Sequence, residues 1–398
     1  MRSWRECKLG ELGIVVTGKT PSSKNPEDWG FEMPFVTPSD YKNYGKFALS
    51  SERNLSKDGI TRLQNKILPE NSIMVTCIGS DMGKVAMNKI SVITNQQINS
   101  IIPDSNIVDS DFLYYRLVSL YETLRIYGSD GTAVPIVNKT DFENLETELP
   151  PLEEQKAIAE VLSSLDDKID LLHRQNQTLE SLAQTLFRQW FIEEAKEEWE
   201  DISLDKCCIK ITKGTTPTTL KKQFVESGIN FIKVNCIDEK GSFLKDKFDF
   251  IDDETNELLN RSKLEKGDIL YSIAGTIGRL AMVDDEILPA NVNQALAILR
   301  VDKSVINPYF VKYCLFDKDI TFELHSKIVH AVQPNLSLGE ISNTLIPYPP
   351  KEILDSFSNQ IEPIEEKINQ NKKQIQTLEN LRDTLLPKLL SGEVRVKI

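Results

Sequence analysis

The sequence has few of the residues from which cross-links and metal sites are built. It contains six cysteines and three histidines in 398 residues, and no two cysteines have C-x-x-C spacing. Neither a disulfide framework nor a zinc site is therefore expected. Reduced thiols with a structural role are the favoured interpretation.

Long apolar runs are also lacking. No stretch approaches the roughly 18 apolar residues that a membrane-spanning helix needs, and the first residues have no apolar core typical of a signal peptide. We therefore expect a cytoplasmic protein with no membrane partner. An apolar content of 40% suits ordinary cores, and the length suits two or three domains.

Signatures of catalysis are missing as well. His173, His325 and His330 have neither triad nor metal spacing. The run Asn307-Pro308-Tyr309-Phe310 lacks the second proline of an adenine-methyltransferase loop, and we interpret it as a helix N-terminus, where proline is favourable. The chain is expected not to be an enzyme and to hold no metal and no cofactor of its own.

The net charge of −13 argues at first sight against a nucleic-acid partner. Much of the acidity is local, because residues 153–201 hold 13 acidic and 5 basic side chains. Such a run is typical of a solvated helix end or linker. The remaining sequence is close to neutral, which leaves room for basic patches assembled by the fold.

Two stretches carry the same apolar repeat. In each, seven positions at alternating steps of four and three residues form the a and d positions of a coiled coil, and the two sets are offset by 199 residues. Apart from Ala183 and Arg382, the positions are Leu165, Ile169, Leu172, Asn176, Leu179 and Leu186, and Ile364, Ile368, Asn371, Ile375, Leu378 and Leu385. Two matched helices in one chain predict one intramolecular coiled coil.

The rest of the sequence is duplicated too. The turn Thr17-Gly-Lys-Thr-Pro21 resembles Lys213-Gly-Thr-Thr-Pro217, the pair Asn95-Gln96 matches Asn293-Gln294, and Pro150-Pro151 matches Pro349-Pro350. Between these anchor points the halves differ at most positions. A long-period repeat of this kind predicts domain, helix, domain, helix.

Local patterns set the fold class, which we predict to be α/β (α+β) with a pseudo-twofold repeat. Short apolar runs between turn residues predict strands at 14–16, 35–36, 73–78, 85–87 and 98–102, and a helix is predicted at 112–124. The predicted segments are a mixed α/β domain at 1–150, a helical segment at 151–198, a second mixed α/β domain at 199–349 and a helical segment at 350–398.

The expected length of the helices suggests that they act as a spacer between the two domains. A helix from Glu153 to Phe191 would be roughly 58 Å long at 1.5 Å per residue, and a repeat about a twofold axis requires the pair to be antiparallel. Pairing about the centres of the two sets places Asn176 opposite Ile375 and Leu179 opposite Asn371. Modules on such a spacer could meet one face of B-DNA, whose turn rises about 34–36 Å.

These features together resemble the specificity (S) subunits of type I restriction–modification systems. The resemblance rests on the duplication, the Thr-Gly-Lys-Thr-Pro turn and the Pro-Pro-Leu-Glu-Glu-Gln-Lys-Ala-Ile-Ala stretch at 150–159, although the second helix starts as Pro-Pro-Lys-Glu-Ile at 349–353. It implies two target-recognition domains on double-stranded DNA, each reading half of a bipartite site. It also implies two methyltransferase (M) subunits and, through them, two restriction/translocase (R) subunits, with S-adenosylmethionine, ATP and magnesium bound by those partners.

Residues that would touch DNA are chosen by side-chain type and by recurrence in both halves. Cations and small polar groups on loops suit phosphate contacts, and glycines before Lys84 and Arg279 let the backbone approach closely. The candidates are Lys19, Lys42, Lys84, Ser129, Lys213, Lys233, Arg279, His330 and Gln333. A solvated surface cation is the alternative for each lysine and arginine. The Asn-Gln pairs could read adenine, although a structural turn is favoured.

A second function remains open at this point. A duplicated scaffold that binds proteins, with a coiled coil that only dimerises it, would suit the acidic composition and the absence of a long basic stripe. The family resemblance extends over the whole chain and favours DNA recognition instead.

Overall fold

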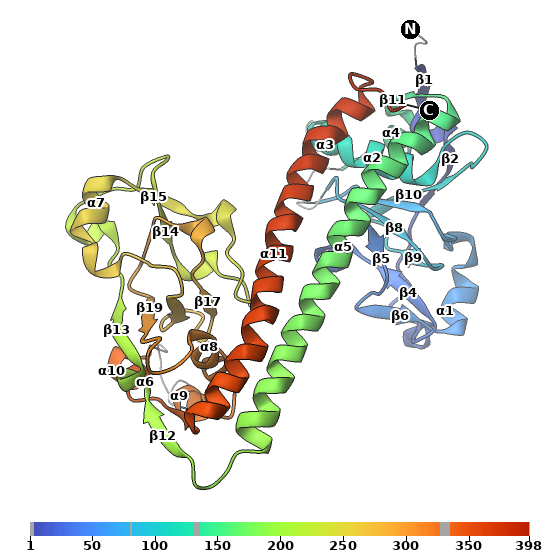
Figure 1. The fold of residues 1–398 in the computed structure, drawn as a ribbon. Coiled ribbons are helices and arrows are strands. Elements are labelled where there is room, and N and C mark those ends of the chain that lie inside the picture. The colour runs from blue at the N-terminus through green and yellow to red at the C-terminus, as the bar shows by residue number, and fades with distance from the viewer. Residues whose placement is uncertain (1–3, 80–81, 130–135, 327–334, 398) are drawn as a thin grey trace. The chain divides into compact units, whose positions relative to one another are not determined.

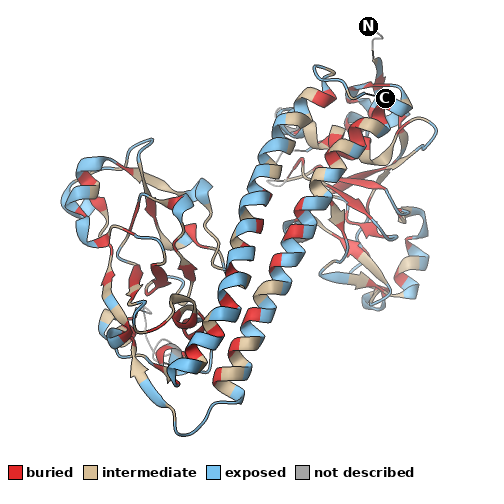
Figure 2. Ribbon diagram, viewed as in Figure 1, coloured by how far each residue is buried: buried red, intermediate tan, exposed pale blue. Residues whose placement is uncertain are grey.

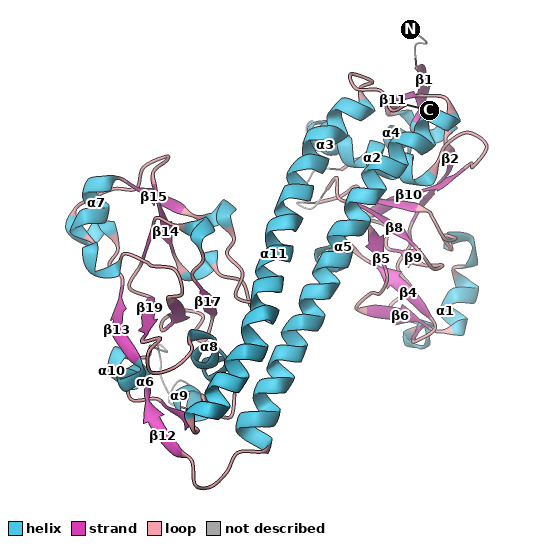
Figure 3. Ribbon diagram, viewed as in Figure 1, coloured by secondary structure: helices cyan, strands magenta, loops and turns pink. Residues whose placement is uncertain are grey.

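The computed structural model describes residues 4–79, 82–129, 136–326 and 335–397, which form two compact units (Figure 1). Unit 1 consists of residues 1–175 and 371–398, and unit 2 of residues 176–370. Two long helices, α5 (Leu152–Arg188) and α11 (Lys351–Leu390), each contribute to both units. Figure 3 shows strands and short helices beside these helices in each unit.

Unit 1 contains three sheets, with strand orders β2-β10-β7-β8-β5, β3-β6-β4-β9 and β1-β11. Most neighbours are antiparallel, whereas β4 with β9 and β5 with β8 are parallel. The strands are β1 Arg5–Lys8, β2 Gly13–Thr17, β3 Trp29–Gly30, β4 Met33–Val36, β5 Phe47–Ala48, β6 Arg53–Leu55, β7 Ile73–Thr76, β8 Val85–Asn88, β9 Ile93–Thr94, β10 Ile98–Pro103 and β11 Glu146–Leu149.

Within the described residues, unit 2 repeats this topology without counterparts of β5 and β3, in the orders β13-β19-β16-β17, β15-β14-β18 and β12-β20. The parallel pair β14 with β18 corresponds to β4 with β9. The strands are β12 Glu200–Ser203, β13 Cys208–Lys213, β14 Ile229–Ile232, β15 Asp249–Ile251, β16 Ile269–Ser272, β17 Leu280–Met282, β18 Ala290–Val292, β19 Leu296–Val301 and β20 Leu345–Tyr348. The duplication seen in the sequence is therefore a duplication of fold.

Short helices connect the strands. They are α1 Lys57–Arg62, α2 Ser110–Ser119, α3 Tyr121–Ser129, α4 Lys139–Asn144, α6 Leu204–Cys207, α7 Asp253–Leu258, α8 Pro308–Phe316, α9 Phe322–Ser326 and α10 Leu338–Ser342. Asn307 caps α8 by accepting a hydrogen bond from the backbone nitrogen of Tyr309, with Pro308 in the first turn, which confirms the helix start predicted there. The single helix expected at 112–124 is instead split at Leu120 into α2 and α3.

Each unit has a core that includes the long helices. Buried residues are concentrated in the strands (Figure 2). In unit 1, Leu162 of α5 and Leu389 of α11 join the core of the strands and α2. In unit 2, Phe191 lies against Phe310 and Phe357, with ring centroids 4.7 and 5.0 Å apart. The helices are therefore structural parts of both units.

The long helices pair in antiparallel fashion, but in a different register from the expected one. Ile169 and Leu172 of α5 pack with Ile375 of α11, and the side-chain amide of Asn176 donates to the carbonyl of Ile368 at 3.5 Å. The expected pairing of Asn176 with Ile375 is therefore wrong, because Ile375 packs with residues four and seven positions before Asn176, and that of Leu179 with Asn371 rests on the same register.

The physical reason is that an apolar seam alone also fits after a shift of one layer along the seam. Contacts other than apolar seam packing distinguish the two registers. In unit 1, Arg382 pairs with Asp166 at 2.9 Å, and in unit 2 the rings of Phe187 and Phe357 lie 6.1 Å apart. These contacts accompany the observed register.

The seam positions predicted from the sequence lie on the inner side of the pair. Six are buried and six are half-buried. The buried ones are Ile169, Leu172, Asn176, Ile368, Asn371 and Ile375, and the half-buried ones are Leu165, Leu179, Leu186, Ile364, Leu378 and Leu385. Helix α5 has 37 residues and continues into a π-helical turn at Gln189–Glu193.

Candidate nucleic-acid interface

In both units, one loop after the first strand of the main sheet meets another loop at the start of the next strand of that sheet. We call this the loop pair: residues 18–21 with 95–97 in unit 1, and residues 214–217 with 293–295 in unit 2. A Cβ atom on Gly18 would lie 2.2 Å from the carbonyl oxygen of Asn95, and one on Gly214 would lie 1.8 Å from that of Val292. Only glycine permits this close approach.

Matching hydrogen bonds join the two loops. The hydroxyl of Thr20 donates to the amide oxygen of Gln96 at 2.7 Å, and Thr216 makes the same bond to Gln294. The preceding asparagines form turns. The side-chain oxygen of Asn95 accepts from the backbone nitrogen of Gln97 at 3.0 Å, and that of Asn293 accepts from the backbone nitrogen of Ala295. The asparagines thus have the structural role that was favoured, while both glutamines are exposed.

Lys19 and Lys213 lie on or beside the loop pair. Lys19 is exposed, and its backbone nitrogen donates to the carbonyl of Thr94 at 2.9 Å. Lys213 is half-buried at the end of β13, and the guanidinium of Arg261 donates to its carbonyl at 3.3 Å. Arg261 was missed by the sequence reasoning, because its partners lie 48 and 46 residues earlier in the chain.

Lys84 and Arg279 occupy equivalent places in the two main sheets. Their backbone nitrogens donate to Thr76 Oγ1 and Ser272 Oγ, at 2.9 and 2.7 Å. The Arg279 guanidinium also donates to two backbone carbonyls of its own unit, at 3.2 and 2.7 Å. A DNA contact by Arg279 stays a prediction, and the Nη1 donors in these bonds are already engaged.

Lys84 lines a cleft of about 310 Å³ together with four tyrosines. These are Tyr41, Tyr44, Tyr114 and Tyr121, which come from the segment after β4 and from the helical segment α2–α3. Burial raises the pKa of Tyr44 and of Tyr114. Tyr44 and Tyr114 are therefore neutral, and Lys84 provides the positive charge at this cleft.

Lys42 and Lys233 form ion pairs with neighbouring acids. The Lys42 ammonium lies 3.2 Å from a carboxylate oxygen of Glu52, and both side chains are exposed. Lys233 pairs with Asp249 and lies 4.6 Å from the ring centroid of Phe224. Exposed pairs contribute little stability, so a DNA phosphate could exchange with the acid on Lys42 more readily than on Lys233.

The other three candidates cannot be located by their side chains. Ser129 is the last residue of α3, but its side chain is not among those described. His330 and Gln333 lie outside the described residues. Their proposed contacts rest on the sequence alone.

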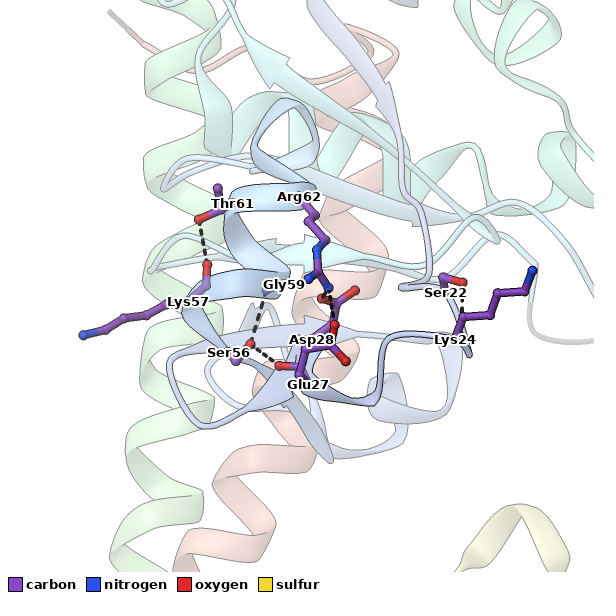
Figure 4. A network of polar contacts seen from close by, with 9 residues as sticks. All are labelled: Ser22, Lys24, Glu27, Asp28, Ser56, Lys57, Gly59, Thr61 and Arg62. Atoms are coloured by element: carbon purple, nitrogen blue, oxygen red, sulfur yellow. Dashed lines mark hydrogen bonds and ion pairs between the residues drawn. The ribbon is translucent and has the colours of Figure 1, made fainter.

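A polar network in unit 1 is flanked by two further cations, Lys24 and Lys57 (Figure 4). Arg62 of α1 pairs with Glu27 at 3.0 Å and with Asp28, and the hydrogen bond to Glu27 raises the pKa of Arg62. Lys24 and Lys57 flank the network and are exposed, and in Figure 4 their side chains point away from it. Sequence reasoning missed both lysines, since neither has a counterpart that marks it in the second half.

Each domain is attached to a long helix by a tyrosine. Tyr115 of α2 donates to Asp166 of α5, and Tyr313 of α8 donates to Glu365 of α11, both at 2.6 Å. Burial, together with the adjacent carboxylate, raises the pKa of each tyrosine. A neutral phenol that donates to a carboxylate fixes the domain on its helix.

The start of α5 makes a further attachment. Gln155 is buried, accepts from the backbone nitrogen of Asp109 at 2.9 Å, and donates to the carbonyls of Ile107 and Pro150. In unit 2 the position offset by 199 residues is Leu354, which is buried in the apolar core. The missing Glu-Gln pair at the second helix start is therefore replaced by apolar packing.

Within the described ranges, no group of three or more His, Cys, Asp or Glu side chains is arranged to hold a metal ion. Likewise, none of the helices that the structure describes combines the length and the apolar character needed to cross a membrane.

Comparisons with known proteins agree on one family. A model of the type I restriction modification DNA specificity domain matches residues 1–181 and 196–380. The MjaIX specificity subunit of Methanocaldococcus jannaschii, a type I restriction enzyme subunit, is 31% identical over 419 aligned residues, which cover 100% of this chain and 94% of that protein. The HindI specificity subunit of Haemophilus influenzae is 38% identical over 154 residues, covering 38% of this chain and 33% of that protein.

The fold agrees with the same family. The crystal structure of a type I restriction-modification S subunit from M. genitalium superimposes with a TM-score of 0.64, at 17% identity. The match covers 97% of this chain and 96% of that one.

Proposed function

Because this chain belongs to the DNA-specificity subunits of type I restriction–modification systems, we propose that residues 1–150 and 199–349 are its two target-recognition domains. Each reads one half of a bipartite site on double-stranded DNA. The chain recognises DNA sequence and is not itself an enzyme, in keeping with its family. The segments 151–198 and 350–398 form the spacer between the domains.

The observation that carries this proposal is the duplication of fold. The two units share strand order, the parallel strand pair and the loop pair, while most of their other residues differ. Two modules with one framework and different surfaces suit the reading of two different half-sites. DNA contacts by Lys19, Lys42, Lys84, Lys213, Lys233 and Arg279 belong to this proposal.

The chemistry is then divided among subunits. The long helices dock two methyltransferase subunits, which flip and methylate an adenine in each half-site with S-adenosylmethionine. Through them, two restriction/translocase subunits use ATP and magnesium to translocate and cut unmodified DNA. The exposed outer faces of α5 and α11 are available for this docking.

The scaffold alternative has no support from the relatives. Their names describe specificity subunits of restriction enzymes, and the matching family is a DNA specificity domain. The acidic composition, which favoured a scaffold, is largely due to residues 153–201 and not to the two domains.

Co-expression with a cognate adenine methyltransferase, followed by methylation sequencing of host DNA, tests the proposal. We expect methyladenine in both halves of one bipartite motif. The absence of new methylation, with the same methyltransferase active beside another specificity subunit, would contradict it.

A further inference from the structure

The glutamine side chains of the loop pair are held by the same kind of hydrogen bond in both units. Gln96 and Gln294 each accept a threonine hydroxyl on the amide oxygen, from Thr20 and Thr216 respectively. Gly18 and Gly214 permit the loop contact that brings these groups together. Two independent copies of the arrangement make it a built feature and not a chance contact of one surface side chain.

The bond leaves a specific chemical group available. A glutamine amide has one accepting oxygen and a nitrogen with two donors. The oxygen is occupied by threonine, and within the described residues the nitrogen Nε2 of neither glutamine has a hydrogen-bond partner. Both side chains are exposed. Each unit therefore presents two oriented N–H donors to the outside, close to Lys19 in unit 1 and to Lys213 in unit 2.

The partner of these donors is an acceptor common to both half-sites. Domains that read different bases need different side chains for that reading. The loop pair instead keeps its glycine, threonine, proline, asparagine and glutamine in two domains that otherwise differ. Phosphate oxygens are present at every nucleotide, and contacts to them set the position of a protein on DNA without carrying sequence information.

Resting on the proposed function, we propose that Gln96 and Gln294 donate through Nε2 to DNA phosphates, one in each half-site. Thr20 and Thr216 are positioning residues that hold the amides in the donating orientation. The contact sets the register of each domain on its half-site and leaves the choice of bases to other residues.

The test uses the complex with its methyltransferase partner. Dissociation constants are measured for Gln96→Leu and Gln294→Leu on the bipartite site, on duplexes with single base changes in either half-site, and on an unrelated duplex of equal length. We expect each variant to weaken binding to every duplex by a similar factor, roughly tenfold. The ranking of the base changes stays as in the wild type.

Salt dependence separates this contact from that of a cation. Removing a neutral donor leaves the slope of log K against log salt concentration unchanged, whereas Lys19→Ala reduces it by about 0.9 if Lys19 contacts a phosphate. Gln96→Glu keeps the oxygen that accepts from Thr20 and adds a negative charge, so it should weaken binding more than Gln96→Leu. Thr20→Val should weaken binding, and Thr20→Ser should restore it.

Gln64→Leu is the matched control, because Gln64 is an exposed glutamine of the same domain that lies outside the loop pair and is not among the proposed DNA contacts. Equal affinities of Gln96→Leu and wild type on all duplexes would overturn the inference. So would a loss confined to particular bases, which would make the glutamines base readers. If Gln96→Leu fails to fold, Gln96→Glu decides by the same criteria. If the wild type itself shows no site preference, the proposed function fails, while the unrelated duplex still tests the phosphate contact.

Discussion

Tyr115 and Tyr313 connect the recognition domains to the long helices through single hydrogen bonds. Asp166, the acceptor for Tyr115, is mostly buried, with 14% of its side chain exposed, and also pairs with Arg382. Glu365, the acceptor for Tyr313, pairs with Lys312, which lies on α8 beside Tyr313. The carboxylate that accepts from the tyrosine is therefore paired with a cation of the other long helix in unit 1, and with a cation of the recognition domain in unit 2.

Tyr115→Phe should lower the free energy of unfolding of unit 1 by about 1–3 kcal/mol, because a charged hydrogen bond is lost and a buried acceptor remains. Hydrogen exchange of β7 and β10 measures the change in that unit. Tyr121→Phe, at a partly exposed ring, should stay within about 0.5 kcal/mol. A double-mutant cycle of Tyr115→Phe with Asp166→Asn that gives no coupling would contradict this account.

All six cysteines are expected to be protonated thiols of low reactivity. Burial raises the pKa of all six thiols, and the pKa values of Cys77 and Cys207 reach about 12 and about 11. A raised pKa lowers the thiolate fraction, and the thiolate is the reactive form. At pH 8 we expect a thiol-reactive reagent to label the native protein slowly and to label six thiols after unfolding. A rapid phase in the native protein, equal to one or more thiols, would show that a thiolate is accessible.

At the scale of elements, the two helix starts are attached by different chemistry. Gln155→Leu should destabilise unit 1 by about 2 kcal/mol or more, because the nitrogen of Asp109 and the carbonyls of Ile107 and Pro150 lose their partner. Leu354→Met in unit 2, a swap of similar volume, should cost less than about 1.5 kcal/mol. Urea unfolding monitored separately in each unit by hydrogen exchange measures both. An unchanged stability of Gln155→Leu would mean that water replaces the amide.

Elements with a strong local pattern could be predicted from the sequence. The apolar runs that became β7 and β10 and the heptads of α5 and α11 are examples. The break at Leu120 and the helix register could not, since both depend on tertiary packing. The bonds that engage Arg279 were also hidden, because their acceptors lie 45 and 42 residues earlier in the chain. Recurrence in both halves identified the loop pair, but not which of its residues point outward.

In the whole molecule, we assign base reading to the domains and the spacing of the half-sites to the helices. The two functions should then be separable. Removing one heptad from each helix, residues 174–180 from α5 and 366–372 from α11, keeps the seam in phase and shortens each helix by about 10 Å. The segments lie opposite each other in the observed register, in which Asn176 meets Ile368.

Methylation sequencing of host DNA, with this shortened chain in place of the wild type, tests whether the helices set the spacing. We expect methyladenine in the same two half-sites, separated by a different number of base pairs. Deletion of 174–180 alone, which leaves the helices unequal, serves as the control and should reduce methylation. An unchanged spacer in the doubly shortened protein, or altered half-site sequences, would contradict the account.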